Sequence, residues 1–165
     1  MIEIVPNIHP FLVHFSIALT IVCFILLNLG YGFSFLKLDR ISKKCFDSAE
    51  IILYMLGIFI ILTIFAGFYA FYTVNFHNMI AHKAMVLHRN IALIFTFSIF
   101  IFIIWAAILS RKKKFPSAFF MMGFIIPVWL SLFTGYLGAE LVYRHSIGVI
   151  KNVEVLQNHS NNHQH

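Results

Sequence analysis

The sequence predicts an all-α membrane protein whose four transmembrane helices form an up-down-up-down bundle. Composition is the first reason. The 165 residues are 61% hydrophobic and only 11% charged, with a mean hydropathy of +0.89, whereas a soluble domain carries about 25% charged residues. Spacing is the second reason, because the apolar residues fall into four long runs, and a bilayer-spanning helix needs roughly 20 such residues.

The positions of the helices follow from these runs, which together make one domain over residues 1–150. The four helices are expected at about residues 9–36, 47–75, 83–110 and 115–143. Asn7 can cap the first helix, and Pro10 suits its first turn. The remaining residues, 151–165, are polar and are expected to form a disordered tail.

The basic residues are divided unequally between the two sides of the predicted bundle. One side carries Lys37, Arg40, Lys43, Lys44 and the run 111–114. Lysine and arginine accumulate in cytoplasmic loops, so we expect both termini outside and the protein in the cytoplasmic (inner) membrane of a bacterium. Topology then accounts for the net charge of +6, and we expect no nucleic-acid binding.

Histidines gather on the side of the bundle opposite to the basic loops. These are His9, His14, His77, His82, His88 and His145. Ionisable groups at the rim of an apolar segment are costly to keep there and therefore indicate a functional site. The alternative for any one of them is a half-hydrated side chain bonded to a backbone carbonyl.

Depth separates His14 and His88 from the other histidines. Each lies five residues into its predicted helix, a depth of about 7–8 Å. The first and third helices are diagonal in such a bundle, so the gap between them exceeds the 8–10 Å of direct packing and suits a planar cofactor. Histidine is an axial ligand of haem iron. We therefore predict His14 and His88 as ligands, with His9, His82 and His145 as secondary candidates.

Three charged residues lie at the same rim, and two roles are open for them. Arg89 and Glu140 are expected at similar depth, where they can form an ion pair that is costly to break. Alternatively, Arg89 or Arg144 can hold a carboxylate such as a haem propionate through paired donors. A face of small residues (Thr134, Gly135 and Gly138) allows close helix packing or leaves room for a flat ligand.

Four segments together resemble one bacterial membrane-protein family. They are HPFLVHFSIAL near the N-terminus, AGFYAFY (66–72), HKAMVLHR (82–89) and TGYLGAELVYRHSIGV (134–149). The family is catalogued as domain of unknown function twenty-two thirty-one, and the resemblance runs from Ile8 to about Val149. This chain has Ala139 and Ser146 where the family often has glycine. The resemblance implies a four-helix membrane protein, and because some members look fused to Rieske-type iron–sulphur domains, it implies a redox setting.

Three functions remain open at this stage. The leading hypothesis is a small b-type cytochrome that binds haem near the outer face and exchanges electrons with a quinone or a periplasmic redox protein. Covalent c-type attachment is excluded because no C-x-x-C-H motif is present. The second hypothesis is a site for zinc, copper or iron built from histidines and Glu140. The third is a structural membrane subunit that needs no cofactor.

Overall fold

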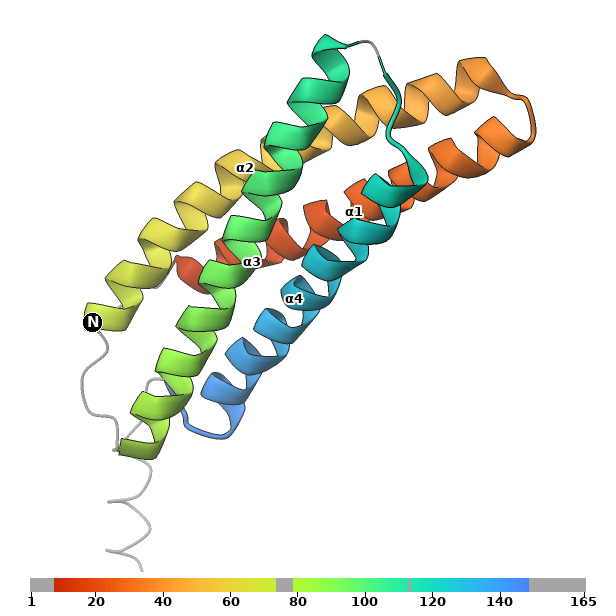
Figure 1. Cartoon of the computed structure of the whole chain (residues 1–165). Coiled ribbons are helices and arrows are strands. Elements are labelled where there is room, and N and C mark those ends of the chain that lie inside the picture. Colours follow the sequence, from red (N-terminus) through yellow and green to blue (C-terminus); the bar gives the residue numbers. More distant parts are fainter. Residues whose placement is uncertain (1–7, 74–78, 113, 149–165) are drawn as a thin grey trace, which may run out of the picture.

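The computed structural model describes residues 8–73, 79–112 and 114–148 (Figure 1). Four helices make up nearly all of these residues: α1 (His9–Phe35), α2 (Asp39–Thr73), α3 (Met79–Arg111) and α4 (Ala118–Tyr143). Each is long and apolar enough to cross a membrane. The predicted all-α fold of four transmembrane helices is therefore confirmed. The expected Asn7 cap and the expected tail lie outside the described residues.

Helix ends differ most from expectation at α2, which begins at Asp39 rather than at residue 47. The charged segment from Asp39 to Asp47 is helical, with Asp39 in the first turn, where a carboxylate favours the positive end of the helix dipole. Lys43 and Asp47 lie one turn apart, with their charged atoms separated by 3.9 Å. Hydropathy marks where a helix enters the membrane, whereas the helix itself continues into water wherever its backbone bonds and propensities allow it.

The four helices pack in the order in which the chain connects them. α1 packs most extensively against α2, α3 packs against α4, and α4 returns against α1, whereas α2 and α3 share the smallest contact. α1 and α3 are therefore diagonal, as are α2 and α4. The α1–α2 and α3–α4 connections lie toward the same end of the molecule (Figure 1), which we call the hairpin end. The opposite end, where α1 and α3 begin and α2 and α4 finish, is the histidine end.

Large apolar side chains fill the core toward the hairpin end. Phe102 of α3 meets Phe120 and Phe124 of α4 edge to face, with ring centroids 5.1 Å apart in each pair. Leu53 and Leu56 of α2 are buried in the same cluster. Because lipid tails are as apolar as these side chains, close van der Waals packing rather than the hydrophobic effect holds the helices together here.

Buried hydroxyl groups replace large apolar side chains toward the histidine end. The buried members are Ser16, Thr20, Thr96, Ser131 and Thr134. Two of the hydroxyls donate to the carbonyl one turn back in the same helix, Thr20 to Ser16 and Thr134 to Leu130, each at 2.7 Å. One bond links two helices, because the Ser16 and Thr63 hydroxyl oxygens are 3.0 Å apart. The core therefore changes along its axis from interlocked rings to hydroxyls.

Candidate functional site

Two histidines meet across the α1–α3 diagonal above the layer of hydroxyls. His9 is the first residue of α1, and His88 lies in the first third of α3. Their ring centroids are 6.2 Å apart and the ring planes are nearly perpendicular, at 84°. A histidine pair therefore bridges the diagonal helices, but it is formed by His9 and His88 and not by the expected His14 and His88.

Each imidazole of this pair rests on a glycine of the next helix. A Cβ atom added at Gly67 of α2 would lie 2.9 Å from Cε1 of His9, closer than side-chain contacts allow. A Cβ atom at Gly138 of α4 would lie 3.3 Å from Cε1 of His88, which is also tight. A side chain at Gly67 would therefore displace the His9 ring, whereas one at Gly138 would need the His88 ring to shift by a few tenths of an ångström.

Backbone carbonyls one turn before these glycines face the two rings. Nδ1 of His9 lies 3.1 Å from the carbonyl oxygen of Thr63, so the Nδ1–H tautomer donates a hydrogen bond to it. The carbonyl of Thr134 faces the ring of His88 in the same way. Nδ1 of His88 is nevertheless buried without a partner at hydrogen-bonding geometry within the described residues.

This arrangement repeats a single pattern in the two hairpins. In each, the first helix supplies a histidine, and the second supplies Thr-x-x-x-Gly, at residues 63–67 and 134–138. The buried positions repeat as well. In α1 and α3, four buried positions lie at the same distances after the histidine: 16, 20, 23 and 27 in α1, and 95, 99, 102 and 106 in α3. In α2 and α4, four buried positions lie at the same distances before the threonine: 60, 56, 53 and 49 in α2, and 131, 127, 124 and 120 in α4. The site thus has an approximate two-fold symmetry that relates α1–α2 to α3–α4.

Two buried side-chain atoms of the described residues have no hydrogen-bond partner at standard geometry, Nδ1 of His88 and Oγ of Ser131. A buried polar atom without a partner costs about 1–3 kcal/mol, and such atoms are uncommon in native proteins. The carbonyl of Thr134 is the acceptor that Nδ1 of His88 faces.

His14 does not take part in the pair. It lies on the exposed face of α1, and its Nδ1 is 2.6 Å from the carbonyl oxygen of Pro10. Five residues separate it from His9, which is about 140° around a helix, so only one of the two can face the bundle interior. The match in depth between His14 and His88 also weakens, because α3 begins at Met79 rather than at residue 83. The structure brings His9, not His14, to His88.

The other histidines predicted as secondary ligands lie apart from the pair. His82 is on the exposed part of α3, with its ring centroid 6.0 Å from that of Phe71, and His145 follows the end of α4. His77 is outside the described residues. Across the described ranges, no three His, Cys, Asp or Glu side chains come together as a metal-binding group.

The three charged candidates form different contacts from those expected. Glu140 pairs with Arg144 one turn further along α4, at 2.7 Å. Arg89 instead places its guanidinium 4.9 Å from the ring centroid of Phe71 and donates to the Asn90 side chain. The expected Arg89–Glu140 ion pair is therefore not formed. His88 faces α4, and the next residue of a helix points about 100° away, which turns Arg89 toward α2.

A double-mutant cycle should reproduce this pairing. Arg144 is 71% exposed and Glu140 is 23% exposed, so we expect a coupling energy of about 0.3–0.5 kcal/mol between Glu140→Gln and Arg144→Gln, as for other helix pairs with this spacing. Glu140→Gln and Arg89→Gln should be additive. The measurement is thermal unfolding in detergent, and coupling of Glu140 to Arg89 instead of Arg144 would contradict the geometry.

Sequence reasoning missed Thr63 and did not assign a role to Gly67. Gly67 stands within AGFYAFY, one of the segments that carry the family resemblance, and Gly138 stands within the closing segment. The signal that could have found them is the recurrence of Thr-x-x-x-Gly in the second and fourth apolar runs. This spacing places a hydroxyl residue and a small residue on the same helix face.

Comparison with known proteins relates nearly the whole chain to one family. A family model described as "Predicted membrane protein (DUF2231)" matches residues 5–151, which include all four helices and both histidines of the pair. No curated protein and no solved structure matches the chain. The chain therefore belongs to the DUF2231 family of predicted membrane proteins.

Proposed function

We propose that this membrane protein binds one haem b non-covalently, with His9 and His88 as the two axial ligands, and serves in electron transfer. The distance between the rings supports the proposal most directly. A ligating imidazole nitrogen lies about 2.0–2.1 Å from a metal ion and its ring centre about 1.1 Å beyond, so two imidazoles across one iron have centres about 6.3 Å apart. The observed separation of the His9 and His88 centroids is 6.2 Å.

The number of protein ligands favours haem over an isolated metal ion. The porphyrin supplies the equatorial nitrogens of haem iron, so the protein needs to add only axial ligands such as histidine. A zinc site takes three or four protein ligands, and sites for copper or non-haem iron also draw on more than two. Within the described residues no third His, Cys, Asp or Glu accompanies a histidine pair, so zinc, copper and iron ions remain weaker alternatives.

The surroundings of the two rings fit a ligating role. Histidines that bind metals usually donate their other ring N–H to a carbonyl or carboxylate, which fixes the ring and its tautomer. Nδ1 of His9 makes such a bond to the Thr63 carbonyl, and in this tautomer the lone pair that a metal would bind is on Nε2. The Thr134 carbonyl faces His88 and can do the same after a small rotation of the ring.

The cations at the histidine end are suited to the propionates of a haem. Arg89 stays on the α2 side of His88, and Arg144 is held at the end of α4 by Glu140. Arginine binds carboxylates through two parallel donors, so we assign Arg89 and Arg144 to the propionates and Glu140 to the positioning of Arg144. Haem supplies a one-electron couple, whose partner would be a quinone in the bilayer or a periplasmic redox protein.

The absorption spectrum of the purified protein tests the proposal. Protein expressed with a supply of haem precursor and purified in detergent should show a Soret band and contain one haem per chain. Metal analysis of the same sample separates the alternatives. Bound zinc, copper or iron in a sample that shows no Soret band would mean that the site binds a metal ion and not haem. A colourless, metal-free sample would favour the third hypothesis, a structural membrane subunit.

We also propose that both termini lie outside the cytoplasmic membrane, which places the His9–His88 pair near the outer face. Reporter fusions in the 111–114 segment and after His145 should therefore lie on opposite sides, the first one inside. A fusion at Phe35, near the α1–α2 connection, should agree with the first. If the 111–114 segment is outside, the haem would face the cytoplasm and a periplasmic partner would be excluded.

A further inference from the structure

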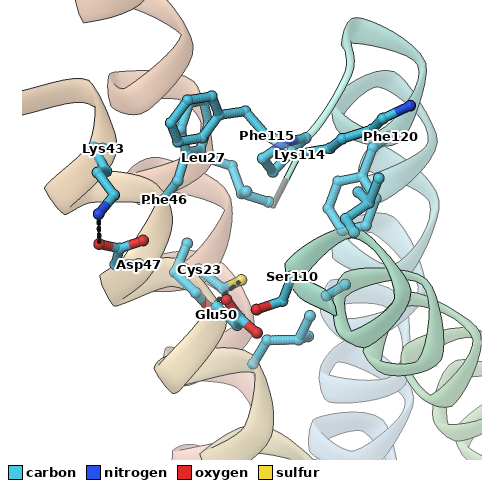
Figure 2. Close-up of a pocket in the computed structure, with 15 residues that line it drawn as sticks. Cys23, Leu27, Lys43, Phe46, Asp47, Glu50, Ser110, Lys114, Phe115 and Phe120 are labelled. Atoms are coloured by element: carbon cyan, nitrogen blue, oxygen red, sulfur yellow. Dashed lines mark hydrogen bonds and ion pairs between the residues drawn. The ribbon is translucent and has the colours of Figure 1, made fainter. Parts of the chain in front are cut away.

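A cavity of about 460 Å³ opens at the hairpin end, remote from the histidine pair. It lies between the early part of α2, the end of α3 and the segment that leads into α4, with α1 behind it (Figure 2). Glu50 stands at its edge directly before the uncharged run of α2, and Leu53 lines it one turn deeper. The cavity therefore spans the boundary between water and the apolar layer. Its volume is within the range of about 300–1,000 Å³ that is usual for small-molecule sites.

The interior of this cavity is apolar and partly aromatic. Cys23, Leu53 and Phe120 line it and are fully or almost fully buried. The rings of Phe46 and Phe115 lie 5.5 Å apart at its upper side, where Figure 2 shows them near Leu27. Ala49 and Ala106, which are also buried, contribute only methyl groups to the wall. These walls suit a flat ring better than a branched or strongly hydrated group.

The mouth of the cavity is polar but electrically balanced. Its charged residues are Lys43, Lys114, Asp47 and Glu50, which sum to zero. Asp47 is next to Lys43, and Glu50 accepts a hydrogen bond of 2.7 Å from Tyr54, so both carboxylates have partners. A phosphate or carboxylate headgroup would meet two carboxylates here. The balance favours a neutral ligand that carries hydrogen-bond acceptors.

Donors for such acceptors stand at the same mouth. Ser110 of α3 directs its hydroxyl toward the opening beside Glu50, whereas the side chain of Lys114 runs toward the start of α4, with its ammonium group beside Phe120 (Figure 2). Serine hydroxyls and lysine ammonium groups both donate hydrogen bonds. An acyl chain of bulk lipid would use the apolar walls but none of these polar groups.

We propose that this cavity binds the head ring of a membrane quinone, with one carbonyl at Ser110 and the ring between the apolar walls. The ligand class matches each feature: a neutral flat ring, carbonyl acceptors and an apolar tail that leaves into the bilayer through the loosely packed α2–α3 side. The inference extends the proposed function, since a quinone is a lipid-soluble electron partner, but the binding itself does not depend on haem.

Fluorescence quenching of Trp105 gives a direct test. The Trp105 ring centroid lies 5.1 Å from that of Phe120, which lines the cavity, and Trp129, the second tryptophan of the chain, is exposed on α4. In a Trp129→Phe background, titration with a short-chain benzoquinone should quench Trp105 along a saturating curve. Quinone that only dissolves in the micelle would quench without saturation, and that result would overturn the proposal.

A pair of alanines on α3 provides matched variants. Ala106→Leu places extra carbons in the cavity and should raise the apparent Kd of the quinone about tenfold or more, as overpacking of a filled site does. Ala107→Leu changes the neighbouring residue, which does not line the cavity, and should leave the Kd unchanged. If Ala106→Leu fails to fold, Ser110→Ala, on an exposed residue, should still raise the Kd about threefold to tenfold through the lost donor.

The visible spectrum of the same samples separates this inference from the proposed function. Saturable quenching without a Soret band would keep the quinone site and reject the haem. A Soret band with unsaturable quenching, or with equal Kd values for the Ala106→Leu and Ala107→Leu variants, would keep the haem and reject the quinone site.

Discussion

Replacing His88 with alanine is expected to abolish or shift the Soret band of protein purified with haem. In the proposed function His88 would hold the haem iron from α3 and His9 would hold it from α1, and no third His, Cys, Asp or Glu of the described residues joins the pair. Loss of one of two axial bonds from a site that is shared by two diagonal helices should release the cofactor or leave it bound by one ligand, with a shifted band. His9→Ala should have an effect of the same kind.

His14→Ala is the matched control, because it removes an imidazole from the same helix as His9 but from the exposed face. It should leave the spectrum and the haem content unchanged. The double variant His9→Ala with His88→Ala should lose no more haem than the more severe single variant, since both ligands serve one iron. If His14→Ala loses the band and His9→Ala keeps it, the sequence-based choice of His14 is right and the ring pair has another role.

Gly67→Ala should produce the second large effect, through a single methyl group. The added Cβ would lie 2.9 Å from Cε1 and 3.1 Å from Nδ1 of His9. The imidazole ring therefore has to move away from α2 and give up its hydrogen bond to the Thr63 carbonyl. We expect the Soret band to shift toward that of haem with one histidine ligand. The visible spectrum and the haem content measure this directly.

Gly32→Ala, near the end of α1, separates the steric effect from the general effect of losing a glycine. A Cβ at Gly32 meets no atom within 4 Å, and alanine favours a helix over glycine by about 0.8–1.0 kcal/mol. This variant should therefore be as stable as the parent or slightly more stable, with an unchanged spectrum. Equal spectra for Gly67→Ala and Gly32→Ala would show that the close contact with Gly67 does not position His9.

The sequence alone was sufficient for the four helices, because long apolar runs admit few other structures in a membrane. It was also sufficient for the diagonal relation of α1 and α3, which follows from short connections in a bundle. It was not sufficient for the start of α2. The residues from Asp39 to Asp47 are polar, and hydropathy does not distinguish a water-exposed helical turn from a loop.

The candidate site was predicted less completely than the fold, and for a different reason. Depth along the helix favoured His14 over His9, whereas the residue that faces the bundle interior is decided by helix rotation, which the weakly amphipathic α1 does not reveal. The expected partner of Glu140 was Arg89, chosen by depth, whereas Glu140 pairs with Arg144 one turn along its own helix. The cavity at the hairpin end could not be foreseen at all, because it arises from the spacing of α2 and α3.

The change of core along the bundle axis has a consequence for assembly of the molecule. The rings of Phe102 and Phe120 join α3 to α4 within one hairpin, and Phe46 of α2 meets Phe115 just before α4, which joins the two hairpins. Most hydroxyl bonds beneath the histidines stay within a single helix and do not join neighbours. The helices at the histidine end are instead joined by the contacts of His9 with α2, of His88 with α4 and by the Ser16–Thr63 bond. If the proposed haem binds between the two rings, these few contacts are the ones that would have to part to admit it into a chain already folded in the bilayer.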